Sequence, residues 1–396
     1  MSTADRKQAI AAARTGDCDT ARKSRKIRIF PSSSQRALLR QWFGVSRYTY
    51  NQALKHLLEP GTKANWMDVA PVIMGAMPEW AKPVPYQIKK IAVKDACIAV
   101  REAKRGFAKD GQFRNCKFRS RRDSRQTIFV PKSAISQRGI YHTLLGEMRF
   151  DEPIPPDFSD GRLTMAYGEY YLVISQEVQP RQPENQGRVV ALDPGVRTFM
   201  TFFSESSCGW IGSDANLRIQ KLCFKLDRLV SKISKAKSSQ KRRFRKAADR
   251  IRCKVQHLVK ELHHKTAKFL VDNFDVILLP SFESSQMVSK SRRKIKSKTV
   301  RQMLTLSHYT FKKHLEWKAW EAGKILLPDI NEAYTYKTVS WTGEVIKIGG
   351  ARVIKSKIDG RVMDRDLNGA RGIFLRALVD TPWLRASLPA YVFVTN

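Results

Sequence analysis

The stretch RVVALDPGVRTFMTFFS, residues 188–204, decides the fold class of this chain. Val189–Leu192 predicts a buried strand, because a short unbroken apolar run is typical of a strand covered on both faces. Asp193 stands at the end of this strand, a Pro-Gly pair predicts the turn, and Thr198–Phe203 predicts a returning second strand. The pattern therefore favours an α/β domain with an acid at the end of a central strand.

Two further strands are predicted to end near acidic residues. VILLP, residues 276–280, reads as a buried strand, and Glu283 follows its proline after three residues. KILLPDINEAYT, residues 324–335, predicts another strand, whose exit carries Asp329 and Glu332. Acids thus follow apolar strands in three separate places.

One more acid precedes a predicted helix. Asp366 lies in DRDLNGAR, residues 364–371, where it is placed to cap a helix from Leu367. Each acid alone has an ordinary structural explanation, such as starting a turn or capping a helix. Together, acids at the ends of separate buried strands and at a helix N-terminus are what a pair of divalent cations needs to hydrolyse a phosphodiester. The set predicts a two-metal nuclease site.

The composition points to a polyanionic partner. The chain has 396 residues, long enough for two or three domains, with 73 Lys and Arg against 36 Asp and Glu, a net charge of +37. Such an excess of like charge repels itself unless a polyanion lies among it, and nucleic acid is the obvious one. No apolar run is long enough for a membrane span and no signal peptide is visible, so we expect an intracellular protein with no membrane partner.

The six cysteines are scattered singly, without any Cys-x-x-Cys pair. This spacing favours reduced thiols over a disulfide framework or a zinc site.

The N-terminal part is predicted to begin with a disordered tail, residues 1–25. A serine cluster after Pro31 offers an N-cap to a helix that runs to about Phe43, and Gly44 separates it from a second helix that starts at Val45. The apolar face of the first helix is expected to consist of Leu38, Leu39, Trp42 and Phe43.

The middle of the chain changes character several times. Residues 60–85 are Pro-rich and predicted irregular, and a helix is expected from Tyr86 through Lys104. Short strands from about 127 to 180, among them GIYHTLL at residues 139–145, predict a small β-barrel or sheet, and residues 179–188 read as a linker.

The C-terminal part is expected to contain two long amphipathic helices and then a third helix that ends at Gly323. His263 and His264 on the second helix are expected to be packing or capping residues before metal ligands. A hairpin is predicted to turn on Gly349 and Gly350.

Three segments are rich in cations. FRNCKFRSRRDSRQ, residues 113–126, interleaves six cations with two phenylalanines, which favours a surface that tracks phosphates. SSQKRRFRK, residues 238–246, is either a basic hairpin tip against nucleic acid or a nuclear localisation signal, and SKSRRKIKSK, residues 289–298, is a basic loop. The candidate nucleic-acid-binding residues are Arg47, Tyr48, Asn51, Gln87, Lys90, Arg119, Arg121, Arg122, Arg242, Arg243, Arg292 and Arg293.

The order of these segments resembles a known family. LDPGVRTF, VILLPSFESSQM, NEAYTYKT and DRDLNGAR are similar to the split RuvC nuclease of the TnpB group, most closely its Fanzor branch, and IRIFPSSSQ is similar to the family's N-terminus. The resemblance implies an RNA-guided DNA endonuclease with Mg²⁺ as cofactor. Its implied partners are a guide RNA and double-stranded target DNA with a short target-adjacent motif. The implied state is a monomer, nuclear if the host is eukaryotic.

The resemblance also implies a domain plan. A wedge β-barrel would span residues 26–180, with a helical recognition domain inserted at about 33–126. A ribonuclease H-like (RuvC) domain would span 181–380, with a degenerate zinc-finger-like insertion at about 336–360. Residues 381–396 would form a tail.

The family pattern bears on which acids bind metal. In TnpB proteins the second strand usually ends in glutamate where this chain has Pro280, whereas Fanzor-type sequences often carry a later glutamate in an E-x-Y-T context, here Glu332. The resemblance thus implies Asp193, Glu332 and Asp366 as the catalytic, metal-binding acids, with Glu283 as runner-up.

One departure from the family concerns zinc. The usual four-cysteine module would place its thiolates where this chain has Val339, Thr342, Ser356 and Asp359, so no zinc is expected. Loss of that module keeps an alternative function open, a guide-RNA and DNA-binding relic or regulator that no longer cuts. A basic RNA-binding protein of ribosomal type would explain the charge but not the acids.

Overall fold

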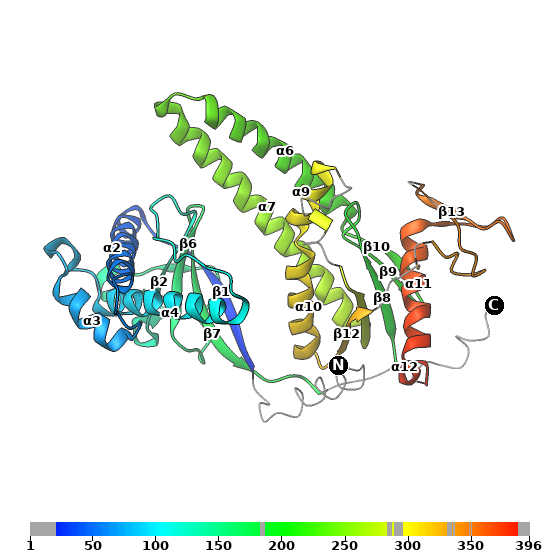
Figure 1. Cartoon of the computed structure of the whole chain (residues 1–396), viewed down its shortest axis with the longest axis horizontal. Helices are drawn as coiled ribbons and strands as arrows, with labels where there is room; N and C mark the ends of the chain where they lie inside the picture. Colours follow the sequence, from blue (N-terminus) through cyan, green and yellow to red (C-terminus); the bar gives the residue numbers. More distant parts are fainter. Residues whose placement is uncertain are drawn as a thin grey trace. The chain divides into compact units, whose positions relative to one another are not determined.

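The structure is a computed structural model that describes residues 21–182, 187–282, 287–288, 296–330, 335, 337–347, 349 and 351–386 (Figure 1). The chain divides into an N-terminal unit, residues 1–178, and a C-terminal unit, residues 179–396, each with its own hydrophobic core. Among the described residues, no helix is both long enough and apolar enough to cross a bilayer.

The N-terminal unit is built on an antiparallel five-stranded sheet. Its strands, in spatial order, are β2 (Arg125–Val130), β6 (Gly161–Ala166), β7 (Glu169–Val178), β1 (Ala21–Phe30) and β5 (Arg149–Phe150). Pairing of β1 with β7 begins at Ala21, so the prediction of a disordered tail to residue 25 was wrong for its last five residues. Ala21 is the only apolar residue among these five, and a long-range backbone ladder orders them.

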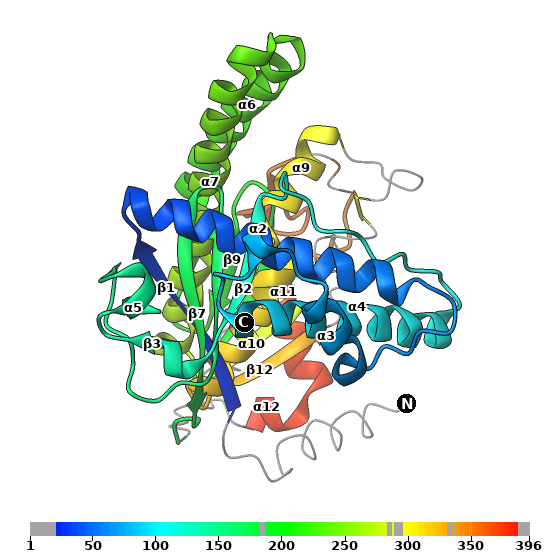
Figure 2. The same cartoon turned by 90° about the vertical axis from the view of Figure 1, so that its left-hand side faces the viewer.

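Two long helices of this unit lie side by side, α2 (Ser33–Leu57) and α4 (Tyr86–Asp110) (Figure 2). A capping box between Ser32 and Gln35 starts α2, as the serine cluster predicted. The predicted break at Gly44 was wrong, because buried residues continue at helical spacing on both sides of it. That packing outweighs the ~1 kcal/mol cost of a glycine inside a helix. Leu38 is 40% exposed and does not belong to the buried face.

Two smaller predictions in this unit were also wrong. Residues 60–85 contain a helix, α3 (Trp66–Gly75), which tolerates Pro71 and buries Val69 and Ile73. The stretch 139–145 is not one strand, because Tyr141 adopts φ 46° and turns the chain. The short elements around these places are η1 (Glu79–Ala81), η2 (Lys132–Ala134), β3 (Ile135–Ser136), β4 (Gly139–Ile140) and α5 (His142–Leu145).

The C-terminal unit is built on a mixed five-stranded sheet. In spatial order its strands are β10 (Cys208–Ile211), β9 (Met200–Ser204), β8 (Val189–Pro194), β11 (Val276–Pro280) and β12 (Ile325–Ile330). The first three strands pair antiparallel, whereas β11 is parallel to both β8 and β12. The predicted strands at 188–204, 276–280 and 324–335 thus form one α/β sheet.

Different helices cover the two faces of this sheet. Residues such as Val190 and Leu192 of β8 pack with α7 (Ser238–Asn273) and α10 (His308–Glu321). Val189 and Ala191 face the opposite way and pack against α11 (Arg365–Asp380), which is followed by α12 (Pro382–Ala386). The alternation along β8 therefore assigns every odd-numbered position, Asp193 included, to the α11 face.

Some of the helices that follow β10 begin and end at positions other than those predicted. α6 (Ser213–Lys235) and α7 form a hairpin joined only at residues 236–237, and it projects beyond the sheet of its unit (Figures 1 and 2). SSQKRRFRK lies at the tip of this hairpin, one of its two predicted roles, and forms the first turns of α7. The single helix predicted to end at Gly323 is two helices, α9 (Ser297–Leu306) and α10, because Ser307 has φ 52°.

The predicted hairpin on Gly349 and Gly350 was also wrong. The strand β13 (Val353–Lys355) pairs with β14 (Val362–Asp364), and the turn lies between them at residues 356–361. Residue 350 itself lies outside the described residues.

Candidate functional site

Asp193 faces helix α11 at close range. A Cβ atom added to Gly369 would lie 2.8 Å from Oδ2 of Asp193, so the carboxylate lies against the helix backbone. Asp193 is the fifth residue of β8, pairs with Thr201 of β9 and is half-buried. The glycine is what allows this approach, since any other residue at 369 would have to displace the carboxylate.

Asp366 lies three residues before Gly369, and residues three apart share one face of a helix. The prediction that Asp366 caps a helix from Leu367 was wrong. The N-cap is Asp364, whose Oδ1 accepts hydrogen bonds from the backbone N–H groups of Asp366 at 2.9 Å and of Leu367 at 3.1 Å. The side chain of Asp366 is half-buried and accepts from Arg365 at 3.3 Å. Capping is therefore done by another acid, and the Asp366 carboxylate is not used for it.

Asn368 ties α11 to the segment that follows β12. This side chain is fully buried; its Oδ1 accepts from the backbone N–H of Ser340 at 2.9 Å, and its Nδ2 donates to the carbonyl of Thr338 at 2.8 Å and of Thr335 at 3.4 Å. Arg371, one turn later, reaches the hydroxyl of Ser340 at 3.5 Å. Both the acceptor and the donor of Asn368 are thus used to hold backbone groups of Thr335, Thr338 and Ser340.

A second glycine of α11 admits the same segment. A Cβ atom at Gly372 would lie 3.1 Å from Cβ and 3.2 Å from the carbonyl oxygen of Thr335. Gly369 and Gly372 are three residues apart, so α11 presents a glycine-lined face that meets Asp193 with one residue and Thr335 with the other. The NGARG sequence therefore provides clearance and a buried amide, which together fix how α11 lies on the sheet.

A β-bulge sits at the exit of β12. The register with β11 shifts between Leu279 and Pro280, Asp329 has φ 64°, and its carboxylate accepts an ion pair from Lys312 at 2.7 Å. Ile325 and Leu327 face α11, and after the bulge Ile330 faces α11 as well. Without the extra residue, Ile330 would point to the other face, so Asp329 resets the alternation of the strand.

Pro280 ends β11 on the same side. The parallel register pairs Val276 with Val189 and Leu278 with Ala191, so two residues further Pro280 corresponds to Asp193. A carboxylate at position 280 would lie next to Asp193, and this chain has none there. Four of the predicted residues, Glu283, Arg292, Arg293 and Glu332, lie outside the described residues.

The carboxylate of Glu344 holds together residues that stand where the family's zinc module would have its thiolates. Oε2 of Glu344 accepts from the hydroxyl of Ser356 at 2.5 Å and of Thr342 at 3.0 Å, and both of its oxygens accept from the backbone N–H of Lys357 at 3.1 Å. The hydrogen bond from Ser356 is the largest of the effects that lower the pKa of Glu344. Two residues at expected thiolate positions thus belong to a hydrogen-bonded network centred on an acid.

Several predicted nucleic-acid contacts of the N-terminal unit have structural partners. The amide of Asn51 donates to the carbonyl of Arg119 at 3.0 Å and accepts from its N–H at 2.8 Å. The Arg119 guanidinium lies 3.8 Å from the ring centroid of Tyr50 and pairs with Asp95 at 3.1 Å. Asn51 and Arg119 therefore anchor the basic segment 113–126, on which Arg121 and Arg122 are exposed.

The other candidates of this unit lie on α2 and α4. Tyr48 makes an edge contact with Trp80 at 5.2 Å between ring centroids, and Arg47 donates to the side chain of Gln126 at 3.0 Å. Gln87 is exposed in the first turn of α4, and Lys90 lies 5.2 Å from the ring centroid of Trp66. Base reading stays a prediction for these residues.

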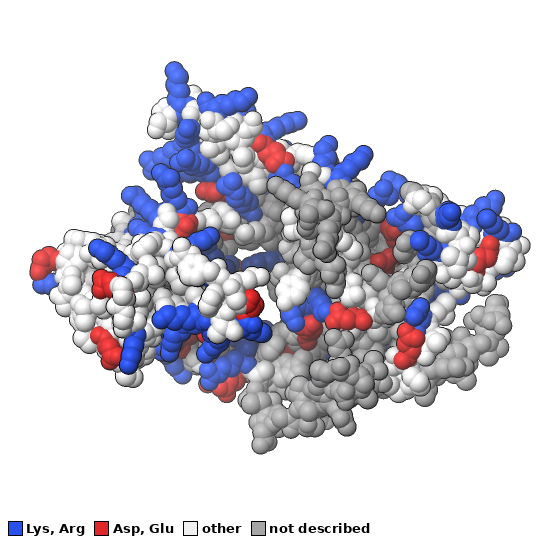
Figure 3. All heavy atoms as spheres, in the orientation of Figure 1, with Lys and Arg blue, Asp and Glu red and all other residues white. Residues whose placement is uncertain are grey.

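The α6–α7 hairpin carries a dense cationic surface. Arg242 and Arg243 are exposed on the first turns of α7, and Figure 3 shows Lys and Arg side chains gathered along the hairpin. At this density the surface is suited to a phosphate backbone.

Comparisons with known proteins match both ends of this architecture. The family model described as Cas12f1-like, TNB domain, matches residues 308–373, which include the N-cap residue Asp364 and the buried residue Asn368. A model described as a helix-turn-helix domain matches residues 21–59, where the structure has β1 and one continuous helix, α2.

Full-length relatives agree with these matches. A TnpB-like protein of Acanthamoeba polyphaga mimivirus is 23% identical over 91% of this chain and 74% of its own length. The chain is thus similar to TnpB-like proteins over most of its length. A putative transposase of Paramecium bursaria Chlorella virus 1 is 25% identical over 94% of the chain and 89% of that protein. The putative RNA-guided DNA endonuclease InsQ of Escherichia coli (strain K12) is 24% identical over 88% and 90%. Among solved structures, a Cas12f1 chain in complex with sgRNA and target DNA is similar over 90% of this chain and 99% of that one, at TM-score 0.49 and 12% identity.

Sequence reasoning missed the residues that position the candidate site. Asp364 caps α11, and the buried amide of Asn368 bonds the segment after β12. Gly369 allows the close approach of Asp193, and Asp329 forms the β-bulge at the end of β12. The doubled acid in DRD was the visible signal for the cap, since either aspartate could fill the N-cap position.

Proposed function

We propose that this chain is an RNA-guided DNA endonuclease of the Fanzor/TnpB type that cuts guide-matched DNA with divalent metal ions held by Asp193, Glu332 and Asp366. The observation that carries the proposal is the contact of the Asp193 carboxylate with α11 at Gly369, one turn from Asp366. Two carboxylates from distant parts of the sequence thereby meet one helix face.

The residues fit a hard cation. Carboxylate oxygens are the ligands that Mg²⁺ prefers, and the capping role that would compete for Asp366 is taken by Asp364. Bound divalent cations would supply water activation and stabilisation of the leaving oxygen. The chain's own contribution is to hold the two acids on a rigid strand and a capped helix, which favours preorganisation.

The sheet order supports a ribonuclease H-like nuclease domain. Three antiparallel strands, β8 to β10, are followed across the sheet by the parallel strands β11 and β12, and α11 covers the face that carries Asp193. This is the arrangement that the resemblance to the split RuvC nuclease implies, with the first acid on the central strand.

The proposed third acid is Glu332, because it stands in the E-x-Y-T context that Fanzor-type sequences often carry. Ile330, the last described residue before Glu332, faces α11 after the bulge. Thr335, three residues beyond Glu332, packs against Gly372 of the same helix. Glu283, the runner-up, follows the end of β11 at Pro280 and lies outside the described residues.

The guide RNA and target DNA would meet the basic surfaces described above. We propose that base pairing with the guide reads the target and that the protein reads only a short target-adjacent motif. Tyr48, Gln87 and Lys90 are the proposed readers; the amide of Asn51 is used on the Arg119 backbone.

A cleavage assay tests the proposal. The protein is purified with its bound RNA, the RNA is sequenced, and matched linear DNA is offered with Mg²⁺. Wild type should cut, and Asp193→Ala and Asp366→Ala should each abolish cutting while leaving RNA binding intact. Failure of the wild type to cut with a verified guide would favour the relic alternative.

A further inference from the structure

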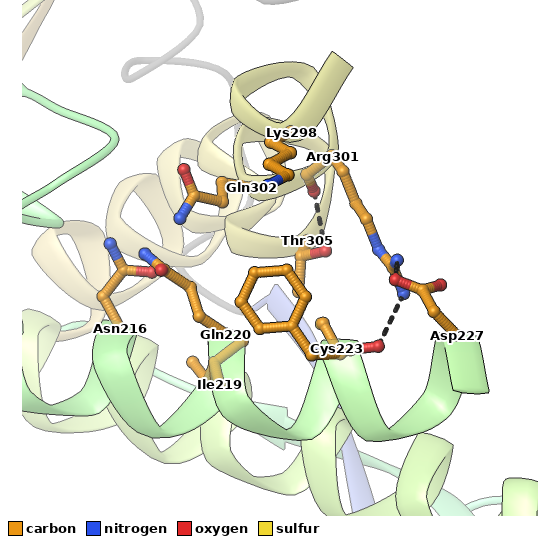
Figure 4. Close-up of a pocket in the computed structure, with 10 residues that line it drawn as sticks. Asn216, Ile219, Gln220, Cys223, Asp227, Lys298, Arg301, Gln302 and Thr305 are labelled. Atoms are coloured by element: carbon orange, nitrogen blue, oxygen red, sulfur yellow. Dashed lines mark hydrogen bonds and ion pairs between the residues drawn. The ribbon is translucent and has the colours of Figure 1, made fainter. Parts of the chain in front are cut away.

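A cavity of about 310 Å³ lies between α6 and α9 of the C-terminal unit, apart from the acidic site (Figure 4). This volume is in the ~300–1,000 Å³ range of small-ligand pockets. Helix α6 lines it with Gln220 and Phe224, and α9 lines it with Lys298, Arg301 and Gln302. None of these residues has a role in the proposed cleavage chemistry.

The cavity offers an aromatic face beside a cation. Phe224 is 50% exposed, which leaves part of its ring accessible. The ammonium of Lys298 lies 5.9 Å from its ring centroid. An aromatic ring and an adjacent cation are the pair that single-stranded nucleic acids use, because every base has a stacking face and every nucleotide a phosphate.

Polar groups on the facing helices complete the site. Figure 4 shows the amide of Gln220 on α6 and that of Gln302 on α9 at the same end of the cavity. Next to them, the amide nitrogen of Asn216 donates to the carbonyls of Val196 and Arg197, while its oxygen is buried without a partner in the described part of the chain. A buried acceptor of this kind needs a donor, and a base edge can provide one.

Arg301 is fixed as one wall of the cavity. Its guanidinium pairs with Asp227 and donates to the carbonyl of Cys223 at 3.3 Å (Figure 4). Asp227 neutralises Arg301, so Lys298 is the cation left for an incoming phosphate.

We propose that this cavity binds one unstacked nucleotide of a single-stranded nucleic acid. The base stacks on Phe224, its edge meets the amides of Gln220, Gln302 and Asn216, and its phosphate meets Lys298. The inference rests on the proposed function, because guided cleavage requires both an RNA guide and a displaced DNA strand.

Binding of short fluorescent oligouridine and oligothymidine to the full-length protein tests the site. Phe224→Ala should weaken binding by about 5- to 150-fold, the range expected for one lost stacking contact. Phe224→Tyr should restore it, and Leu217→Ala, an exposed residue of α6 outside the cavity, should have no effect. Thermal unfolding checks that each variant is folded; a half-exposed side chain should be removable without loss of the fold.

The two probes separate the sources of the nucleotide. A loss confined to oligouridine assigns the cavity to RNA, a loss confined to oligothymidine assigns it to DNA, and a loss with both supports a site for either strand. Binding of folded Phe224→Ala within twofold of wild type for both probes would overturn the inference.

Cleavage by the guide-loaded wild type distinguishes this inference from the proposed function. If the wild type cuts and Phe224→Ala binds normally, the cavity is not a nucleotide site and the nuclease proposal stands. If the wild type does not cut and Phe224→Ala binds weakly, the cavity stands and the nuclease proposal fails.

Discussion

Asp193 and Gly369 are in contact, with Oδ2 of the aspartate 2.8 Å from where a Cβ atom of residue 369 would lie. The relationship joins a strand acid to the NGARG helix across more than a hundred residues of sequence. It requires glycine at 369 for a steric reason and not for flexibility, since the residue lies inside a regular helix.

Gly369→Ala should therefore strongly reduce DNA cleavage while RNA binding persists. The added methyl group displaces the Asp193 carboxylate or tilts α11. The matched control is Gly44→Ala, also inside a helix, whose Cβ would meet only Arg47 Nη2 at 3.8 Å. That control should raise stability by about 0.5–1 kcal/mol. Equal cleavage by Gly369→Ala and wild type would show that the contact has no role in the site.

Asn368→Ala should destabilise the C-terminal unit and abolish cleavage. It leaves the backbone groups of Ser340 and Thr338 without their partner, at ~1–3 kcal/mol for each buried unsatisfied group. Asn273→Ala removes an exposed amide that also bonds a backbone carbonyl, and it should change stability by less than about 0.5 kcal/mol. Thermal unfolding measures both variants. If the two variants had similar melting temperatures, the buried hydrogen bonds of Asn368 would not stabilise this unit.

Asp329→Gly should retain the bulge and the activity, whereas Asp329→Val should lose both. Glycine adopts φ 64° freely, and a β-branched residue does so only with strain of ~1–3 kcal/mol. Both variants remove the ion pair with Lys312, so this pair of substitutions isolates the backbone effect. Equal cleavage by the two variants would mean that the bulge does not position the site.

Acid should weaken the C-terminal unit through a buried histidine. Burial lowers the pKa of His308, which stacks on Phe199, to about 4 from 6.5. A lowered histidine pKa means that the unfolded chain binds the proton first. Stability is therefore complete above about pH 6.5 and falls by about 3 kcal/mol as the pH drops to about 4.

Urea unfolding at the two ends of this window measures the effect. His308→Phe should flatten the pH dependence, and His142→Phe, at an exposed position on α5, should leave it unchanged. A pH dependence that survives in His308→Phe would assign the effect to other groups, of which His314, also with its pKa lowered to about 4, is the first candidate.

Much of the C-terminal sheet could be predicted because its strands are short apolar runs. Val189–Leu192 and Val276–Pro280 are buried on both faces, and an unbroken apolar run predicts such a strand without knowledge of its neighbours. His263 was also predicted as a packing residue, and it stacks near Phe199 and bonds the carbonyl of Leu306 at 2.8 Å.

What sequence reasoning missed depends on long-range contacts. The strand at Ala21 exists because β7 pairs with it, and α2 runs through Gly44 because the core covers it on both sides. A bulge at Asp329 has no local signature, since it arises from register between two strands. Asp364 and Asp366 are equivalent as caps until the helix start is known.

Glu332, and not Glu283, is proposed to complete the site with Asp193 and Asp366. The most direct measurement is cleavage of matched DNA by guide-loaded Glu332→Ala and Glu283→Ala, side by side and with Mg²⁺. We expect Glu332→Ala to bind RNA without cutting and Glu283→Ala to retain most activity. An inactive Glu283→Ala together with an active Glu332→Ala would contradict this proposal.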